Sequence, residues 1–137
     1  MTTNHQELMD VFYGKCLSVQ PGIDPAEELN KILADHFVSY GSSDAKSKEQ
    51  LIAQIGFFWK LVPDLKWEPQ EIIHDHNKAV VRSLASGTPN GNFMGVPTDG
   101  SKSFKIMTID IHHFENGKVA HVHHLEDWMT AMMQLKS

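Results

Sequence analysis

The chain has very little cysteine, no long apolar run and no run of basic residues. Its single cysteine, Cys16, excludes an internal disulfide and a zinc site built of cysteines alone. No apolar stretch approaches the roughly 20 residues that a membrane-spanning helix needs, and the first residues lack the pattern of a secretory signal. The net charge is −5 with dispersed Lys and Arg, which argues against nucleic acid or a membrane surface as partner. We therefore expect a cytoplasmic protein.

The overall amino-acid composition is typical of an ordinary globular protein. The chain has 137 residues, of which 41% are hydrophobic and 21% charged, and this predicts a single domain over residues 1–137. The unusual count is nine histidines. These bear on function only if the fold brings several of them together.

Apolar residues at helical steps predict helices in the first half of the chain. Asp24 followed by Pro25 is typical of an N-cap and first helical position, and the apolar face of this helix extends to Phe37. Another helix begins at Ser47, whose spacing to a glutamine indicates a capping box, and ends at Pro63.

Apolar and polar residues alternate through much of the second half, which predicts strands over residues 67–74, 79–86, 104–114 and 119–126. Residues 90–103 are rich in Gly, Pro, Asn and Asp, and we expect a long loop there. A short helix over residues 127–135 ends the chain. Helices followed by antiparallel strands predict an α+β fold, with the helices on one face of a curved antiparallel sheet and a small-molecule pocket between the two layers.

The turn Asn116–Gly117 sets a register for the last two strands, because Asn-Gly is the strongest short-range hairpin signal. In this register His112 faces His121 and Asp110 faces His123 across the strand pair. These four side chains then share one sheet face, which is far more polar than an ordinary core.

Three interpretations of this polar face remain open at the level of sequence. It is a solvated surface, or a metal site formed by His112, His121 and His123 with Asp110 or Asp127, or the wall of a catalytic pocket. In the last case Asp127 is the candidate acid/base, because burial raises the pKa of a carboxyl group. Asp127 also precedes the final helix, so an N-cap explains it equally well.

A series of short segments carries a family resemblance. In chain order they are Pro63-Asp64-Leu65, Val80-Val81-Arg82, Gly87-Thr88, the run from Gly91 to Thr98, the run from Glu115 to Val119, Asp127 and Gln134-Leu135. Their order and spacing resemble the SnoaL-like polyketide cyclase (ester cyclase) family over about residues 30–135. The resemblance implies a cone-shaped, nuclear-transport-factor-2-like α+β fold with a pocket, often assembled as a homodimer through its sheets.

The resemblance also implies a chemistry. The best-known members close a polyketide ring by intramolecular aldol condensation without a cofactor, using a pocket aspartate whose position matches Asp127. Arg82 and Thr88 match the arginine strand and the glycine-threonine turn of the family. Tyr40 and His123 stand where the family usually has histidine and tryptophan.

From the residues and the resemblance together we expect a cofactor-free and metal-free cyclase, isomerase or lyase that acts on a small hydrophobic carbonyl compound. The predicted catalytic residues are Asp127, His123 and His112, and the predicted substrate contacts are Tyr40, Arg82, Trp59 and Thr88. The alternatives are a non-catalytic small-molecule binding module on the same fold and, less favoured, a histidine-coordinated metal-dependent enzyme.

Overall fold

Side chains at two helix starts fix where those helices begin in the computed structural model, which describes residues 4–137. The Asp24 carboxylate accepts a hydrogen bond from the backbone N–H of Ala26, and Ser47 forms a reciprocal capping box with Gln50. Both predicted starts are confirmed. The described helices are α1 (His5–Val11), the π-helical segment η1 (Phe12–Cys16), α2 (Pro25–Ile32), α3 (Lys48–Leu61) and α4 (Trp128–Lys136).

The strands form a six-stranded sheet in the order β2-β1-β8-β7-β4-β3 and a separate two-stranded hairpin, β5–β6. Their bounds are β1 (Leu33–Tyr40), β2 (Ala45–Ser47), β3 (Lys66–Asp75), β4 (Lys78–Gly87), β5 (Asn90–Phe93), β6 (Val96–Asp99), β7 (Phe104–Glu115) and β8 (Lys118–Glu126). The predicted α+β class and the four predicted strands are confirmed. The pair β1–β8 is parallel, whereas the other neighbours in the sheet are antiparallel.

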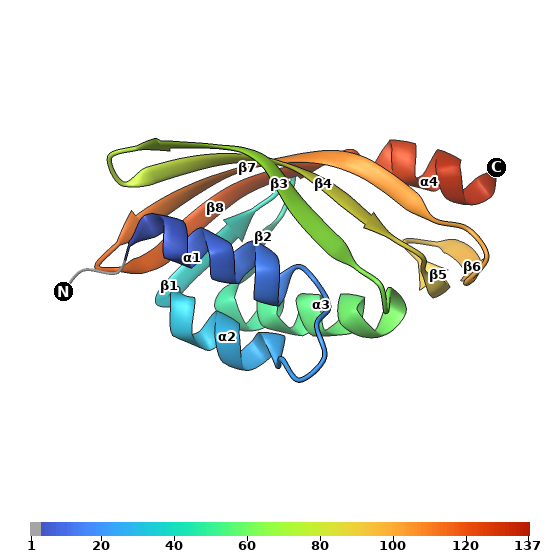
Figure 1. The fold of residues 1–137 in the computed structure, drawn as a ribbon, viewed down its shortest axis with the longest axis horizontal. Helices are drawn as coiled ribbons and strands as arrows, with labels where there is room; N and C mark the ends of the chain where they lie inside the picture. The colour runs from blue at the N-terminus through green and yellow to red at the C-terminus, as the bar shows by residue number, and fades with distance from the viewer. Residues whose placement is uncertain (1–3) are drawn as a thin grey trace.

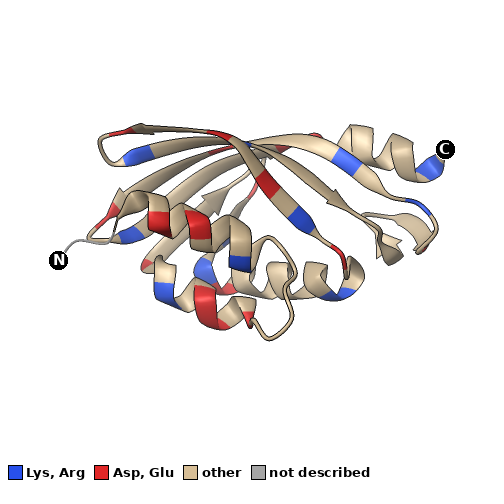
Figure 2. Cartoon of the chain, in the orientation of Figure 1, with Lys and Arg blue, Asp and Glu red and all other residues tan. Residues whose placement is uncertain are grey.

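The sheet curves over the helices, as Figure 1 shows. Helices α1, α2 and α3 lie under its concave face, while α4 packs against the start of β7, near the β5–β6 hairpin. The buried core lies between these layers and includes Leu29 of α2, Ile55 of α3 and Val81 of β4. Lysine and arginine residues are dispersed among acidic ones over the helices and strands (Figure 2). Among residues 4–137, no helix is both long and apolar enough to cross a membrane.

Two segments differ from the sequence-based expectation. Residues from Leu33 onwards, expected to continue the second helix to Phe37, instead form β1, because they pair with the distant strand β8. The expected loop over residues 90–103 contains the β5–β6 hairpin, which turns at Met94 and Gly95, both with positive φ. The Thr98 side chain supports this hairpin by bridging the backbone N–H and C=O of Gly91.

A β-bulge in β8 changes the predicted register of the last hairpin. Phe114 pairs with Val119 as expected, but His113 then pairs with His121, so Ala120 is the extra residue. The predicted pairing of His112 with His121 is therefore wrong, since a shift of one residue exchanges the two faces of the strand.

Candidate functional site

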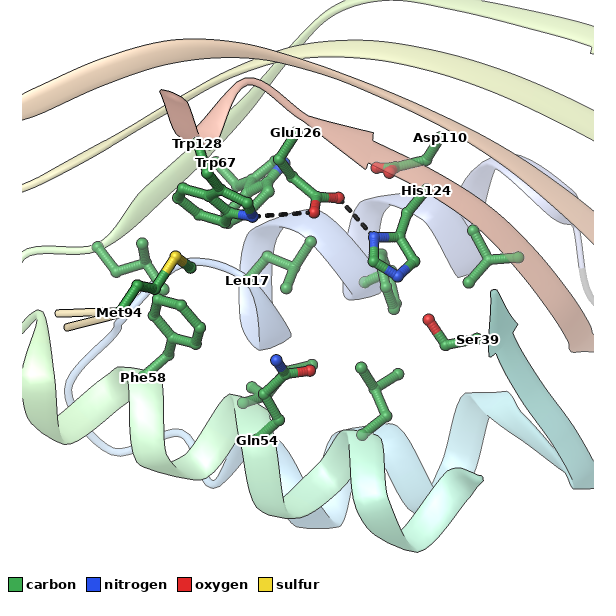
Figure 3. A pocket seen from close by; sticks show the side chains of 15 residues that line it. Leu17, Ser39, Gln54, Phe58, Trp67, Met94, Asp110, His124, Glu126 and Trp128 are labelled. Atoms are coloured by element: carbon green, nitrogen blue, oxygen red, sulfur yellow. Dashed lines mark hydrogen bonds and ion pairs between the residues drawn. The ribbon is translucent and has the colours of Figure 1, made fainter. Parts of the chain in front are cut away.

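An apolar cavity of about 100 Å³ lies between α3 and the concave face of the sheet. Aromatic and aliphatic side chains make up most of its wall, and the polar groups are few (Figure 3). The lining residues are Phe12, Leu17, Ser39, Leu51, Gln54, Ile55, Phe58, Leu65, Trp67, Met94, Asp110, Val122, His124, Glu126 and Trp128. A mostly apolar cleft with a few convergent polar groups is typical of a small-molecule site.

Asp110 of β7 is the most deeply buried acid of this wall, with only 3% of its surface exposed. Burial raises the pKa of its carboxyl group to about 7, and the charge of Glu126 acts in the same direction. The hydrogen bond from Tyr13 and the charge of His124 oppose this increase. Near neutral pH this carboxyl group is therefore able both to release and to accept a proton.

A buried hydrogen-bond chain holds Asp110 in place from behind. The Tyr13 hydroxyl donates to Asp110 Oδ2 at 2.6 Å and lies 2.7 Å from His112 Nε2. Because the hydroxyl hydrogen is committed to Asp110, His112 must donate from Nε2, and its Nδ1 has no hydrogen-bond partner. Burial lowers the pKa of His112 to about 3, so this imidazole is neutral and acts as a fixed donor.

His124 of β8 lies directly opposite Asp110 in the strand pair and contributes the second titratable group of the wall. Its Nδ1 is 2.7 Å from Glu126 Oε2, and the indole N–H of Trp128 donates to the other oxygen of Glu126 at 3.2 Å. Figure 3 shows Glu126 held between these two side chains. Its hydrogen bond and negative charge raise the pKa of His124 above the usual value.

This arrangement places two proton-exchanging groups side by side in a largely apolar cavity. The Glu126 carboxylate accepts from Nδ1–H of neutral His124, which leaves Nε2 as the free proton acceptor. The pKa of Asp110 is about 7, that of His124 is raised by Glu126, and the two groups interact electrostatically, so they exchange protons as a coupled pair. A base and an acid are thus available together at the same pH.

The predicted acid/base Asp127 does not line the cavity. It is exposed and caps α4, where its carboxylate accepts from the backbone N–H of Thr130 at 3.2 Å and from the Thr130 hydroxyl at 2.6 Å. The expectation of an inward-facing Asp127 is therefore wrong. The bulge at Ala120 turns Glu126 inward instead, and the next residue begins the helix.

The predicted site residues His112, His123 and Tyr40 also lie outside the cavity. His112 is on the concave face but buried behind Asp110. His123 points to the opposite, convex face, where the Tyr40 ring stacks on it with 5.0 Å between ring centroids. The bulge accounts for His123, since it reverses the predicted face of every β8 residue that follows it.

The remaining predicted substrate contacts, Arg82, Thr88 and Trp59, are hydrogen-bonded to other residues of the protein. Arg82 Nε donates to Glu71 at 3.1 Å on the convex face, and the Thr88 hydroxyl donates to Asp64 at 2.8 Å. The Trp59 indole donates to the backbone carbonyl of Cys16 at 2.8 Å. None of these three side chains lines the cavity.

Sequence reasoning missed His124 and Glu126, because the predicted register placed them on the sheet face opposite to that of Asp110. The signal that could have found them is the adjacent apolar pair Val119 and Ala120, followed by Val122. All three are almost fully buried, and a regular strand cannot bury both members of an adjacent pair on one face. A bulge at this point is the arrangement that buries all three and also brings His124 inward.

Comparison with known proteins gives a consistent match over the whole fold. The sequence model of the SnoaL-like polyketide cyclase family matches residues 13–135. A structure from Jannaschia sp. CCS1, assigned as a SnoaL-like polyketide cyclase, superposes with a TM-score of 0.84 at 19% identity, covering 96% of this chain and 91% of that chain. No significant match was found among curated proteins.

Two structures from Streptomyces are similarly close. TsrD from Streptomyces laurentii gives a TM-score of 0.81 at 25% identity, covering 95% of this chain and 92% of that chain. IdmH from Streptomyces antibioticus, assigned as a polyketide cyclase, gives 0.80 at 20% identity, with coverages of 96% and 98%.

Proposed function

Because this chain belongs to the SnoaL-like polyketide cyclase family, whose fold is nuclear-transport-factor-2-like, we propose that it is a cofactor-free enzyme for a small apolar carbonyl compound. The proposed reaction moves a proton from the carbon next to a carbonyl group, as in an aldol-type ring closure or an isomerisation. The observation that carries this proposal is the pairing of Asp110 and His124 in the apolar cavity.

In this proposal His124 is the base and Asp110 the acid. Neutral His124 takes the proton from the activated carbon at Nε2, while Nδ1–H remains bonded to Glu126. Protonated Asp110 gives its proton to the oxygen that becomes the enol or the alcohol. A ring closure of this kind transfers one proton from carbon to oxygen overall, so the pair is reset when His124 returns its proton to Asp110, its neighbour across the strands.

The wall of the cavity indicates the class of substrate. Phe58, Trp67 and Trp128 present aromatic rings, and Ser39 and Gln54 add neutral polar groups. No lysine or arginine is among the lining residues, so a phosphate or carboxylate group on the substrate would find no permanent positive charge in the cavity. We propose a flat, uncharged ketone or diketone.

The test is deuterium exchange at the carbon next to the carbonyl of small aryl ketones such as 2-tetralone, followed by proton NMR in D₂O. We expect the wild type to exceed the buffer rate, and Asp110→Asn and His124→Gln each to lose about 100-fold or more, the usual contribution of a general acid or base. Asp127→Asn is the matched control, because asparagine also caps a helix and the position lies outside the cavity.

Two outcomes would contradict this assignment. Wild-type binding of such ketones without any exchange would favour the alternative, a non-catalytic binding module. Loss of exchange in Asp127→Asn with full exchange in Asp110→Asn would move the acid/base back to the position that the sequence suggested.

We also propose that two copies of the chain associate through the convex face of the sheet, as the family resemblance implies. This face carries an unusual number of exposed apolar side chains in register on neighbouring strands: Ile73, Met107, Ile109, Ile111 and Leu125. Exposed apolar side chains gathered on one face in this way are typical of interfaces between subunits.

A further inference from the structure

Three histidines gather on the convex face of the sheet, on the side away from the cavity. His113 of β7 pairs with His121 of β8, and their rings stack with 4.0 Å between centroids. His123, two residues further along β8, has its ring centroid 5.6 Å from that of His121 and 5.8 Å from that of His113. One ring nitrogen of each residue lies within 4.8 Å of those of the other two.

The fold produces this cluster through the bulge in β8. Without the extra residue at Ala120, His121 would lie opposite His112 and face the helices. With the bulge, the two β8 histidines and His113 share the convex face. His112, which the sequence suggested as a ligand, is buried on the other face and bonded to Tyr13, so it cannot belong to this group.

We propose that His113, His121 and His123 form a binding site for one divalent transition-metal ion. Imidazole is a preferred ligand of Zn²⁺, Ni²⁺ and Cu²⁺, and three imidazoles leave at least one coordination position open to water or another ligand. In a tetrahedral zinc site with Zn–N bonds of about 2.0–2.1 Å, the nitrogens lie roughly 3.3 Å apart. The proposal requires these rings, which are exposed or half-buried, to rotate until their nitrogens converge on the ion.

Neighbouring side chains restrict the rings of the two β8 histidines, His121 and His123. The Tyr40 ring stacks against His123 and meets His121 edge-on, so these imidazoles already have a restricted orientation. The opposing influence is Lys78, which pairs with His113 on the neighbouring strand and whose positive charge repels a cation. Lys78→Met should therefore strengthen metal binding, whereas loss of any of the three histidines should weaken it.

The experiment titrates the tag-free full chain with ZnCl₂ and with CuCl₂ by isothermal calorimetry. We expect one ion per chain, tighter binding of Cu²⁺ than of Zn²⁺, and no comparable binding of Mg²⁺, which prefers oxygen ligands. His121→Ala and His123→Ala should each weaken Zn²⁺ binding by about 100-fold or more, since loss of even an outer-shell partner costs 10–100-fold.

His76→Asn is the matched control, because His76 is an exposed histidine outside the cluster and asparagine tolerates its positive φ. Circular dichroism checks that each variant is folded. The nitrogen superhyperfine splitting in the electron paramagnetic resonance spectrum of bound Cu²⁺ reports how many nitrogens coordinate the ion. The proposal is overturned if the wild type binds Zn²⁺ no more tightly than His121→Ala. It is also overturned if His76→Asn weakens binding as much as the cluster variants.

Discussion

Asp110 and Asp127 carry the same side chain in opposite surroundings, and this difference determines their roles. Asp127 is exposed and caps the first turn of α4, which stabilises the helix. Asp110 is 3% exposed and has one hydrogen bond, from Tyr13 Oη. Removal from water therefore dominates at Asp110 and raises the pKa of its carboxyl group.

The raised pKa of Asp110 predicts a cost in stability at alkaline pH. The unfolded chain releases this proton near pH 3.8 and the folded chain only near pH 7, so this group favours folding at low pH. Its contribution is lost as the pH rises through this window. Asp110→Asn cannot ionise, and we expect it to be more stable than the wild type at pH 8 by up to about 4 kcal/mol, which is the difference between pKa 3.8 and about 7 at 1.36 kcal/mol for each pKa unit.

Thermal denaturation at several pH values measures this effect. The gain of Asp110→Asn over the wild type should grow between pH 5 and pH 7 and then level off, whereas Asp127→Asn should follow the wild type throughout. A gain that is the same at every pH would contradict an Asp110 carboxyl group that titrates near neutrality.

At the scale of elements, the features that were predictable from sequence are those with local causes. The helix starts at Asp24 and Ser47 and the hairpin turn at Asn116 depend on a few neighbouring residues, and each is confirmed. The strand beginning at Leu33 was not predictable, because its stability comes from parallel pairing with the distant strand β8. The bulge at Ala120 likewise depends on which side chains the core buries. Because of this bulge, His124 and Glu126 face the cavity and Asp127 does not.

The β5–β6 hairpin offers a test of how the cavity is closed. Met94 lines the cavity although it occupies a turn position with a φ of 50°, which an ordinary side chain adopts only with strain. Asparagine followed by Gly95 is the preferred sequence for such a two-residue turn. We expect Met94→Asn to stabilise the protein by about 0.5–1 kcal/mol and to make the cavity more accessible, because the thioether is removed from its wall.

Two measurements check this expectation for Met94→Asn. The melting temperature should rise, and binding of an apolar fluorescent dye such as ANS should increase. A fall in the melting temperature together with unchanged dye binding would show that the Met94 side chain stabilises the hairpin more than its backbone strain costs.

At the scale of the whole molecule, the sheet separates two surfaces with different properties. Its concave face, covered by the helices, holds the cavity with Asp110 and His124 (Figures 1 and 3). Its convex face carries the histidine cluster at one end and exposed apolar side chains such as Met107 and Ile109. Residues of one strand serve both faces, because successive side chains alternate.

The proposed association through the convex face predicts the effect of a charge placed there. Met107 is 49% exposed, and in a symmetric pair of chains Met107→Lys would bring the new charge into the interface twice. We expect light scattering after size exclusion to give twice the mass of one chain for the wild type and the mass of one chain for Met107→Lys. Phe57→Lys is the matched control, because Phe57 is 59% exposed on α3, in the helical layer on the other side of the sheet.

A wild-type protein that elutes as a single chain, or a Phe57→Lys variant that dissociates as Met107→Lys does, would contradict association through this face.

The most direct measurement for the central claim is a carbon-13 NMR titration of the Asp110 carboxyl group, assigned by comparison with Asp110→Asn. We predict a midpoint near 7 in the wild type, where burial opposes ionisation. The midpoint should fall in Glu126→Gln, because a neighbouring negative charge is removed, and rise in Tyr13→Phe, because the stabilising hydrogen bond is lost. A wild-type midpoint near that of an exposed aspartate, about 4, would contradict the assignment of Asp110 as the acid/base of this cavity.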